Sequence, residues 1–333
     1  MKIHTNIGSI ASYKKYLEVK DATLDFLKKN TYLELELPVL SPALVPESYL
    51  EVFETEYRYM NNREKLYLTP SPELFIKRLL ANGIGDCFYL GKSFRNAERH
   101  SERHGSEFTM LEFYKTNATY LDISNVTLNL LQHIAESLLK KKTIIYNGTT
   151  VSLERWDKMT VDESFITYAH LEAGTIFDEE SLRDAAKQKG YVTDGFSYED
   201  IFSQMYVHEV EPHLGMNGFP TMLYDYPKEF AALAQLNGDS KTAQRFEFYI
   251  AGVELGDCYT ELTDPIEQKK RFVTEDNKRK QDNKINHPVD WGFVEALEKG
   301  LPACSGIAIG FDRLAMVFAD VPTIHDLKVV EVW

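Results

Sequence analysis

Two arginines that lie far apart in the chain could together hold the phosphates of a nucleotide. Arg95 lies in the segment Phe94-Arg95-Asn96-Ala97-Glu98, and Arg313 follows shortly after the glycine-spaced run 306–310. A guanidinium group donates fixed, charge-assisted hydrogen bonds, which stabilise the negative charge that develops on phosphates during transfer. We therefore predict that Arg95 and Arg313 flank one pocket suited to nucleotidyl transfer.

The composition is that of an ordinary globular protein. Of the 333 residues 44% are hydrophobic, which is enough for a core. Because no apolar run approaches roughly 18 residues and the first residues lack a signal-peptide pattern, we expect a cytoplasmic protein without a membrane partner. The net charge of −14 argues against a broad nucleic-acid contact. Three separated cysteines favour buried thiols over a disulfide framework or a zinc ribbon.

Hydrophobic periodicity predicts the elements that position the first arginine. Helices are predicted over 12–29 and from Pro72 to Leu80, and a long helix over 120–142. Alternating or apolar runs bounded by turn residues predict strands. These lie at 32–37, 49–57 and 65–69, with a hairpin turn at Asn61-Asn62, and at 87–94 and 108–116, which should form an antiparallel pair.

The second half of the chain predicts more helix and then strand again. Acidic helical stretches at 179–188 and 198–210 lie within a segment of about 149–214, which we interpret as a helical insertion over the sheet. Strands are predicted at 221–226, 246–255 and 304–310. Because strands and helices do not alternate strictly, the pattern favours an α+β fold with an antiparallel sheet over a Rossmann fold. Without a convincing linker, we predict a single domain over 1–333.

The order of six motifs resembles the catalytic domain of a class II aminoacyl-tRNA synthetase. Pro38 stands where that class has its motif 1 proline, Phe94-Arg95 begins motif 2, and Gly310-Phe311-Asp312-Arg313 closes motif 3. The lysyl branch matches best, through Ser71-Pro72-Glu73, 107–112, 245–247 leading to Glu254, and 261–264. The resemblance covers nearly the whole chain and implies an antiparallel sheet flanked by helices. It also implies a homodimer formed through the motif 1 helix and strand.

Within that branch, the chain resembles the lysyl-tRNA synthetase paralogues that attach (R)-β-lysine to a lysine of translation elongation factor P. The segments 287–290, 295–297 and 300–306 carry this resemblance. The chain starts almost directly with the helix before motif 1, so we expect no anticodon-reading contact with tRNA. Ala308 stands where lysyl-tRNA synthetases usually have glycine, and its methyl group would reshape an amino-acid pocket slightly.

The resemblance implies that motifs 2 and 3 bind ATP. Arg95 would clamp the α-phosphate and the substrate carboxylate, because a guanidinium fork can bridge two anions, and Arg313 would hold the γ-phosphate. Phe108 would stack on adenine. The other implied ATP contacts are Asn96, Glu98, His104 and Glu247. As an alternative, the charged residues between the two strands form a solvated loop, which suits Arg99, Glu102 and Arg103.

The resemblance also implies that Glu247 and Glu254 bind Mg²⁺ between the ATP phosphates. Hard carboxylate oxygens suit Mg²⁺, which neutralises phosphate charge. The two acids lie seven residues apart, a spacing that puts them on opposite faces of one strand unless a bulge or bend intervenes. Simple alternation therefore does not explain the pair, and Glu247 as a surface strand residue is the alternative.

A lysine-like substrate has two amino groups, and several acidic side chains could accept hydrogen bonds from them. The implied residues near its side-chain end are Glu112, Tyr114 and Glu261, and those near its other amine are Ser71 and Glu73. Tyr259 and Ala308 complete the implied substrate-binding set. Converging like charges are costly unless a cation binds them, so their convergence would indicate a cationic ligand. Each acid taken alone is more simply a solvated surface residue.

Two departures from the family pattern affect this assignment. The motif 2 loop, 98–107, is one residue longer than usual, which leaves the role of His104 open. Asp257 stands where the relatives commonly have asparagine, and an acid there would repel a substrate carboxylate unless it is protonated or bound to a metal. His100 and His104 are four residues apart, but a zinc site lacks a third ligand.

Three functions therefore remain open. The first is a two-step ligase that forms an aminoacyl adenylate and then acylates elongation factor P. The second is a synthetase-like enzyme that aminoacylates tRNA or a small molecule. The third is a non-catalytic sensor of an amino acid, which the joint presence of Arg95, Glu247, Glu254 and Arg313 disfavours, because a sensor needs no triphosphate site.

Overall fold

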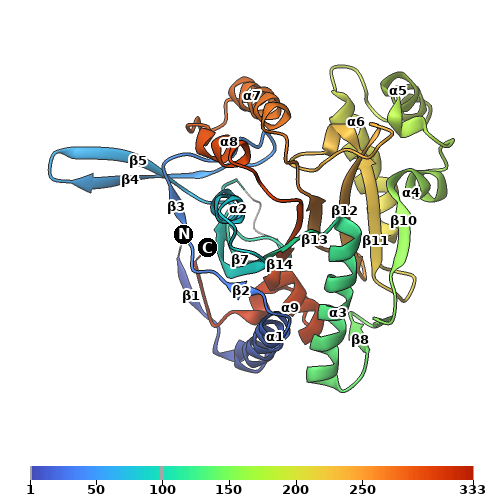
Figure 1. Ribbon diagram of the computed structural model, residues 1–333. Coiled ribbons are helices and arrows are strands. Elements are labelled where there is room, and N and C mark those ends of the chain that lie inside the picture. Colours follow the sequence, from blue (N-terminus) through green and yellow to red (C-terminus); the bar gives the residue numbers. More distant parts are fainter. Residues whose placement is uncertain (1, 98–100, 333) are drawn as a thin grey trace. The chain divides into compact units, whose positions relative to one another are not determined.

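The chain forms two compact units, of which the first is built from both ends of the sequence. The computed structural model describes residues 2–97 and 101–332. The first unit comprises 1–118 and 261–333, and the second comprises 119–260. Both contain strands packed with helices (Figure 1), which confirms the predicted α+β class. The single domain over 1–333 stays a prediction.

The first unit is centred on a sheet in the order β14-β7-β6-β2. Strands β6 and β7 pair antiparallel as predicted, β14 pairs antiparallel with β7, and the short β2 adds in parallel to β6. The sheet strands are β2 (Leu33–Glu34), β6 (Cys87–Phe94), β7 (Glu107–Thr116) and β14 (Cys304–Gly310). The helices are α1 (Ile10–Lys29), α2 (Glu73–Ala81), α7 (Pro265–Gln281), α8 (Trp291–Glu298) and α9 (Phe311–Ala319), with 3-10 turns η1 (Ile7–Ser9) and η6 (Ile324–Leu327). Helix α1 packs on α9, and α8 packs on both α2 and α7.

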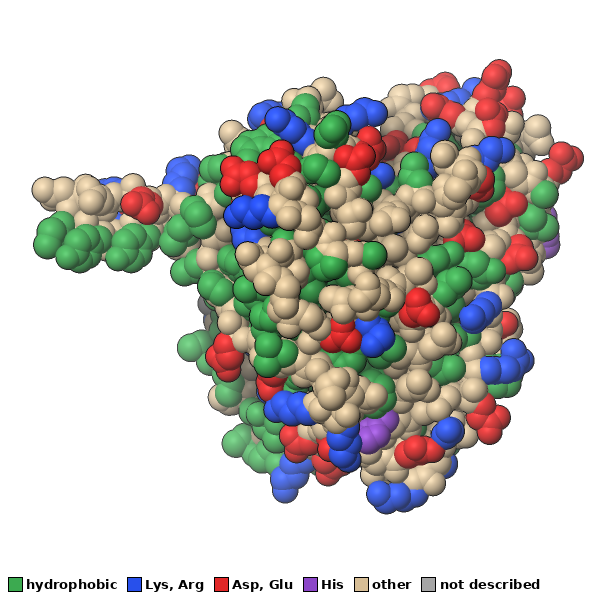
Figure 2. Space-filling view, viewed as in Figure 1, with side chains coloured by type: hydrophobic (Ala, Val, Ile, Leu, Met, Phe, Trp, Pro, Cys, Tyr) green, Lys and Arg blue, Asp and Glu red, His purple; other side chains and the backbone are tan. Residues whose placement is uncertain are grey.

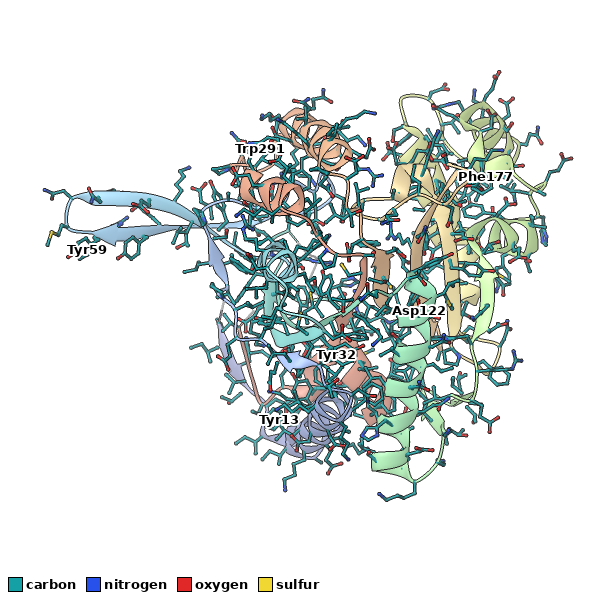
Figure 3. All side chains as sticks on the ribbon, viewed as in Figure 1. Tyr13, Tyr32, Tyr59, Asp122, Phe177 and Trp291 are labelled. Atoms are coloured by element: carbon teal, nitrogen blue, oxygen red, sulfur yellow. The ribbon has the colours of Figure 1, made fainter. Side chains whose placement is uncertain are left out.

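Two smaller sheets complete the first unit. Strands β1 (Ile3–Thr5) and β15 (Val330–Val332) pair antiparallel and bring the two ends of the chain together. The other small sheet is built from β3 (Leu40–Ser41), β4 (Phe53–Tyr59) and β5 (Asn62–Leu68). The β4–β5 hairpin extends away from its unit (Figure 1), and hydrophobic side chains follow one of its edges (Figure 2). Tyr59 lies near the tip of this hairpin (Figure 3).

The second unit has a sheet in the order β10-β11-β12-β13, in which only the β10–β11 pair is parallel among the described strands. The strands are β8 (Thr143–Tyr146), β9 (Thr149–Ser152), β10 (Asp157–Thr160), β11 (Thr221–Pro227), β12 (Thr242–Ile250) and β13 (Val253–Thr260). The helices are α3 (Tyr120–Leu139), α4 (Val161–Tyr168), α5 (Glu179–Gln188) and α6 (Tyr198–Met205), with short turns η2 (Thr175–Phe177), η3 (Tyr206–Val210), η4 (Glu211–His213) and η5 (Lys228–Phe230). Asp122 caps the start of α3 by accepting from the Thr119 amide.

Several element boundaries differ from the sequence prediction. The predicted strand 246–255 is two strands, β12 and β13, joined by a turn at Ala251-Gly252. The hairpin turn lies at Met60-Asn61, one residue earlier than predicted, and the strand predicted at 32–37 is reduced to β2. The segment 149–214 begins with β9 and β10 and continues with α4, α5 and α6, and its interpretation as an insertion stays a prediction. Apolar periodicity does not distinguish one long buried strand from a hairpin, because both place the same residues in the core.

Two further sequence expectations can be compared with the structure. All three cysteines are buried free thiols, as predicted. No helix in the described part of the chain is both long and apolar enough to cross a membrane.

The pairing of β14 with β7 leaves room for a large side chain on one face. Gly306 lies opposite Tyr114, and an added Cβ at Gly306 would lie 2.3 Å from Cε1 of the Tyr114 ring. Real Cβ atoms do not approach this closely, so the ring would have to move. Glycine at this position is therefore what allows the tyrosine to lie over the strand.

We expect Gly306→Ala to lower the free energy of unfolding by about 1–3 kcal/mol, because overpacking forces neighbouring side chains from their preferred rotamers. Urea denaturation measures this change. Gly238→Ala is the matched control, since no atom lies within 4 Å of an added Cβ there. Equal stability of the two variants would contradict the close packing of Gly306 against Tyr114.

Candidate active site

A buried acid cluster lies on the face of the first unit's sheet. The Tyr114 hydroxyl donates to Glu112 Oε1 at 2.7 Å, and the Ser71 hydroxyl donates to Glu112 Oε2 at 2.7 Å. Ser71 also accepts from the Glu73 amide at 3.0 Å, which joins the cluster to the start of α2. Ala308 lies directly opposite Glu112 in the β14–β7 register, so the two side chains share one face. Five residues of the predicted substrate-binding set are therefore brought together.

Lys77 is the cation of this cluster, and the sequence analysis did not assign it a role. Its ammonium group lies 2.5 Å from Glu73 Oε1 and 2.6 Å from Glu261 Oε2, and its side chain is fully buried. Burial alone would lower the pKa of Lys77, but the charges of Glu261 and Glu73 outweigh it and raise the pKa. Lys77 therefore stays charged, and it joins α2 to Glu261, the residue at which the chain re-enters the first unit.

The acids of this cluster exceed its cations. Among the described side chains, three carboxyl groups face the single ammonium of Lys77. Burial, to which the charge of Glu73 adds, raises the pKa of Glu112 to about 8. Burial likewise raises the pKa of Glu261 to about 8, against the opposing charge of Lys77. Burial thus opposes the ionisation of both carboxyl groups, and additional positive charge would favour it.

Arg313 is held against the motif 2 loop at the start of α9. Its Nε donates to the carbonyl of Arg103 at 3.0 Å, and its Nη2 lies 2.7 Å from Nε2 of His104. Because a guanidinium only donates, Nε2 of His104 accepts, and the proton of the imidazole is on Nδ1, 3.0 Å from the Ser101 hydroxyl. His104 is therefore neutral here and orients Arg313, which brings two predicted ATP-binding residues into contact.

Arg95 lies beside the predicted adenine platform. Its guanidinium is 5.3 Å from the centroid of the Phe108 ring, in a cation–π contact. Its backbone amide donates to the Ser106 carbonyl at 3.0 Å, which closes the base of the motif 2 loop. Glu98 lies outside the described residues.

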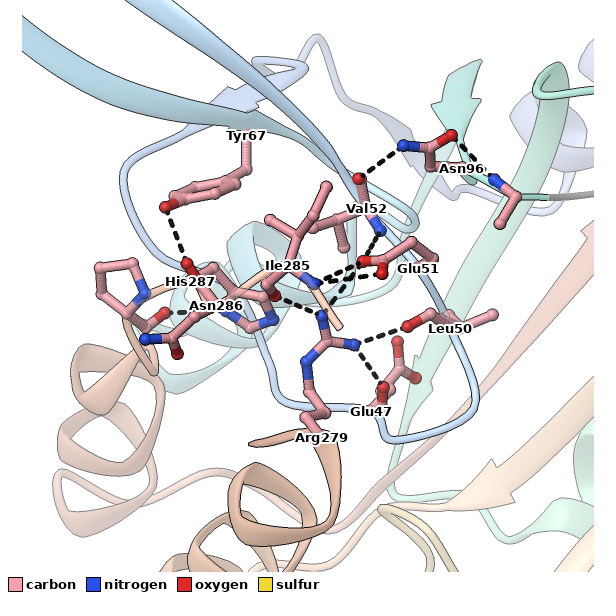
Figure 4. A network of polar contacts seen from close by, with 12 residues as sticks. Glu47, Leu50, Glu51, Val52, Tyr67, Asn96, Arg279, Ile285, Asn286 and His287 are labelled. Atoms are coloured by element: carbon pink, nitrogen blue, oxygen red, sulfur yellow. Dashed lines mark hydrogen bonds and ion pairs between the residues drawn. The ribbon is translucent and has the colours of Figure 1, made fainter. Parts of the chain in front are cut away.

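Asn96 binds protein rather than facing open space. Its side-chain amide donates to the Val52 carbonyl at 3.1 Å, and its backbone amide donates to the Glu51 carbonyl at 2.9 Å (Figure 4). Asn96 therefore fastens motif 2 to the loop 47–52. Its predicted contact with ATP stays a prediction.

A buried arginine from α7 holds the same loop. Arg279 donates to the carbonyls of Glu47 and Leu50 at 2.8 and 2.6 Å, and to the Ile285 carbonyl at 2.8 Å (Figure 4). Its Nη2 also lies 3.5 Å from Glu51 Oε1. A charge buried with this many acceptors sets the backbone geometry of the loop. The loop that borders motif 2 is therefore fixed by a residue more than two hundred positions away.

In the second unit, Arg245 bridges two acids on neighbouring strands. Its Nη2 donates to Glu247 Oε1 at 2.7 Å, and its Nε donates to Asp257 Oδ1 at 3.0 Å. The Tyr259 hydroxyl donates to Asp257 Oδ2 at 2.7 Å, and Glu247 and Asp257 are paired in the β12–β13 register. Burial raises the pKa of Asp257 to about 6, with Arg245 opposing it. Both oxygens of Asp257 thus have donors, which offsets the repulsion expected from an acid at this position.

The hairpin resolves the odd spacing of Glu247 and Glu254. They lie on the adjacent strands β12 and β13, on either side of the turn, and the register shifts by a bulge between Phe248 and Tyr249. Burial raises the pKa of Glu247, Arg245 opposes it, and the charge of Glu254 raises it further. The two carboxylates therefore lie close enough to repel each other.

This pair suits a hard divalent cation. Two carboxylates that repel each other favour a cation beside them, and Mg²⁺ takes one or two protein carboxylates together with water and phosphate oxygens. No group of three or more acids, histidines or cysteines that could hold a metal occurs among the described residues. Both oxygens of Glu247 accept hydrogen bonds, from Arg245 and Tyr249, and the binding of Mg²⁺ by Glu247 and Glu254 stays a prediction.

The residues missed by sequence reasoning are Lys77 and Arg245, the cations that organise the acids. Each had a local signal. Lys77 lies one helical turn after Glu73, and Arg245 lies two residues before Glu247 on the same strand face. Such spacings also occur in exposed surface pairs, so only their burial distinguishes them.

The fold and the motifs agree with a known family. The family described as tRNA synthetases class II (D, K and N) matches residues 10–329. The chain therefore belongs to this family.

The similar curated proteins are lysine–tRNA ligases. The chain is 33% identical to the one of Staphylococcus saprophyticus over 326 residues, which is 97% of this chain and 64% of that protein. It is 34% identical to the one of Carboxydothermus hydrogenoformans over 306 residues, or 91% of this chain and 61% of that protein. The chain thus spans somewhat less than two thirds of the length of these relatives.

Lys77→Met should destabilise the protein strongly and in a pH-dependent way. Removing one partner of a buried ion pair leaves uncompensated charge and costs about 3–5 kcal/mol. The folded pKa values of Glu112 and Glu261 lie above the ordinary 4.5, so the folded protein binds these protons more tightly than the unfolded chain does. The resulting stabilisation of the folded state is fully present below pH 4.5 and is lost as the pH rises through about 8. Without Lys77 the carboxyl pKa values rise further, so we expect the variant's deficit to be larger at pH 8 than at pH 5.5.

Urea denaturation at the two pH values measures this deficit. Lys14→Met, an exposed lysine on α1, is the control and should unfold like the parent protein at both values. A deficit for Lys77→Met that does not grow with pH would contradict the role of Lys77 as the counter-charge of the cluster.

Proposed function

We propose that this protein activates a lysine-like amino acid with ATP, as an aminoacyl adenylate, and transfers it to a lysine side chain of translation elongation factor P. The amino acid is proposed to be (R)-β-lysine. Family membership supports the adenylate step, and the sequence resemblance to the paralogues of lysyl-tRNA synthetase supports the acceptor.

The excess of acidic over basic side chains in the acid cluster is the observation that supports a lysine-like amino acid. Glu73, Glu112 and Glu261 face only one ammonium among the described side chains, and both strongly buried glutamates have raised pKa values. A ligand with two ammonium groups supplies the two missing positive charges. A lysine-like substrate has this charge, whereas an acidic or apolar amino acid does not.

In the first proposed step, a carboxylate oxygen of the amino acid attacks the α-phosphorus of ATP. The new bond is a mixed anhydride, the bond between the α- and β-phosphates breaks, and pyrophosphate leaves. Arg95 would neutralise the α-phosphate and the carboxylate, and Arg313 would neutralise the leaving phosphates. In the second step, an acceptor amine attacks the carbonyl carbon, an amide forms, and AMP and a proton leave.

The protein's own groups would act by position and charge. Preorganised donors lower the barrier because they need no reorganisation as charge develops. Arg313 has such preorganisation through His104 and the Arg103 carbonyl. Mg²⁺ held by Glu247 and Glu254 would neutralise phosphate charge.

A second candidate function is the aminoacylation of tRNA. It is favoured by the names of the similar proteins, which are lysine–tRNA ligases. The net charge of −14 disfavours a broad contact with a phosphate backbone. The two candidates share the adenylate step and differ only in the acceptor.

We further propose a cytoplasmic homodimer joined through the motif 1 helix and strand. Exposed hydrophobic side chains on α1 and on the strands after it support this proposal. They are Ile10, Leu17, Leu33 and Leu40. A subunit interface formed by this helix and these strands would remove the four side chains from water.

Exchange of labelled pyrophosphate into ATP tests the adenylate step. We expect exchange that depends on lysine or β-lysine, and a decrease of at least about a hundredfold in Arg313→Ala, because one positioned charge donor contributes on this scale. Arg63→Ala, an exposed arginine of the β4–β5 hairpin, is the control and should exchange normally. Absence of exchange with every lysine-like compound would overturn the proposal.

Mass measurement of candidate acceptors identifies the second step. After incubation with ATP and β-lysine, elongation factor P should gain the mass of one β-lysyl group at a lysine. The same reaction with tRNA in place of the factor serves as the comparison. Charging of tRNA without any gain on the factor would favour the second candidate function.

A further inference from the structure

A small cavity beside the acid cluster has an acidic wall that the assignments above do not use. Glu47 lines it together with Ser71 and Glu73, and apolar side chains such as Leu44, Pro70 and Leu74 form the rest of the wall. Ser71 also donates to Glu112, so the cavity wall shares Ser71 and Glu73 with the acid cluster. Glu47 is therefore a candidate for contact with the same ligand.

Charges of both signs act on the Glu47 carboxylate. Burial raises the pKa of Glu47 to about 7, the positive charge of Arg95 opposes this rise, and the negative charge of Glu73 adds to it. The Tyr49 hydroxyl donates to Glu47 Oε1 at 3.0 Å. Glu47 thus lines one cavity with Glu73, and its carboxylate is influenced by the charges of both Arg95 and Glu73.

The backbone around Glu47 is held in place from α7. Arg279 donates to the Glu47 carbonyl and the Leu50 carbonyl (Figure 4). The amide of Ser48 donates to Glu275 Oε2 at 3.0 Å. A side chain carried by such a fixed loop can position a ligand group with little loss of conformational entropy on binding.

We propose that Glu47, together with Glu73, binds the ammonium group of the substrate that lies nearer its carboxylate. An ammonium has three donors, which match the two carboxylates and the hydroxyl of Ser71 on the cavity wall. Its charge also relieves the repulsion between Glu47 and Glu73. This inference rests on the proposed activation of a lysine-like amino acid and makes its substrate class narrower.

The substrate class is a diamino acid that has one amine close to the carboxylate and one at the far end. The far amine binds at the end of the site that contains Glu112 and Glu261, and the near amine binds to Glu47 and Glu73. An amino acid that lacks the near amine supplies no ammonium group to Glu47, so it binds less tightly than one that has this amine. Glu47 is therefore a specificity-determining residue.

Titration calorimetry with three compounds tests this assignment. Lysine and β-lysine have both amines, whereas 6-aminohexanoate has only the far one. In Glu47→Gln, we expect the affinity for lysine or β-lysine to fall about tenfold to a hundredfold, since one charge-assisted hydrogen bond is lost. The affinity for 6-aminohexanoate should change less than about threefold. Glu47→Asp keeps the charge and should recover part of the loss.

Glu64→Gln makes the same change at an exposed glutamate of β5 and should bind all three compounds like the parent protein. Thermal unfolding of Glu47→Gln checks that the fold is kept. Equal weakening of all three compounds, or of none, would overturn the role of Glu47. If this binding pattern holds but pyrophosphate exchange is absent, the adenylate step fails and the role of Glu47 stands.

Discussion

The buried contact of Lys77 with Glu73 and Glu261 is the interaction on which the first unit depends. It connects a helix of the N-terminal part to the residue at which the chain returns to that unit. Burying charge is costly, and the attraction between close partners offsets this cost only when the geometry is good. The contact leaves Glu112 without a cation of its own. The same interaction that holds the elements together therefore leaves an excess of acidic groups in the cluster, on which the proposed binding of a cationic amino acid rests.

The register of the sheet decides which side chains can join this cluster. Tyr114, Glu112 and Met110 share a face with Gly306, Ala308 and Gly310 on the neighbouring strand. Small residues on one strand leave space above them for the large and acidic residues of the other. The glycine spacing of the third family motif thus makes room for the acid cluster and also precedes Arg313.

Each functional charge is held by another group before any ligand binds. His104 and the Arg103 carbonyl orient Arg313, Arg245 bridges Glu247 and Asp257, and Arg279 fixes the loop that carries Glu47. Groups held in this way stabilise charge without the cost of reorganisation. This organisation suits the proposed nucleotidyl transfer, in which position and charge lower the barrier.

The sequence by itself determined the α+β class, the bounds of β6, β14 and α5, and the family, because periodicity and motif order are local properties. It could not show that 246–255 is a hairpin, since two buried strands and one have the same apolar pattern. It also gave no role to Lys77 or Glu47, because local spacing cannot distinguish a buried ion pair from a surface one. Only the tertiary structure decided these points, since burial, and with it the strength of each charge interaction, comes from contacts between residues far apart in the chain.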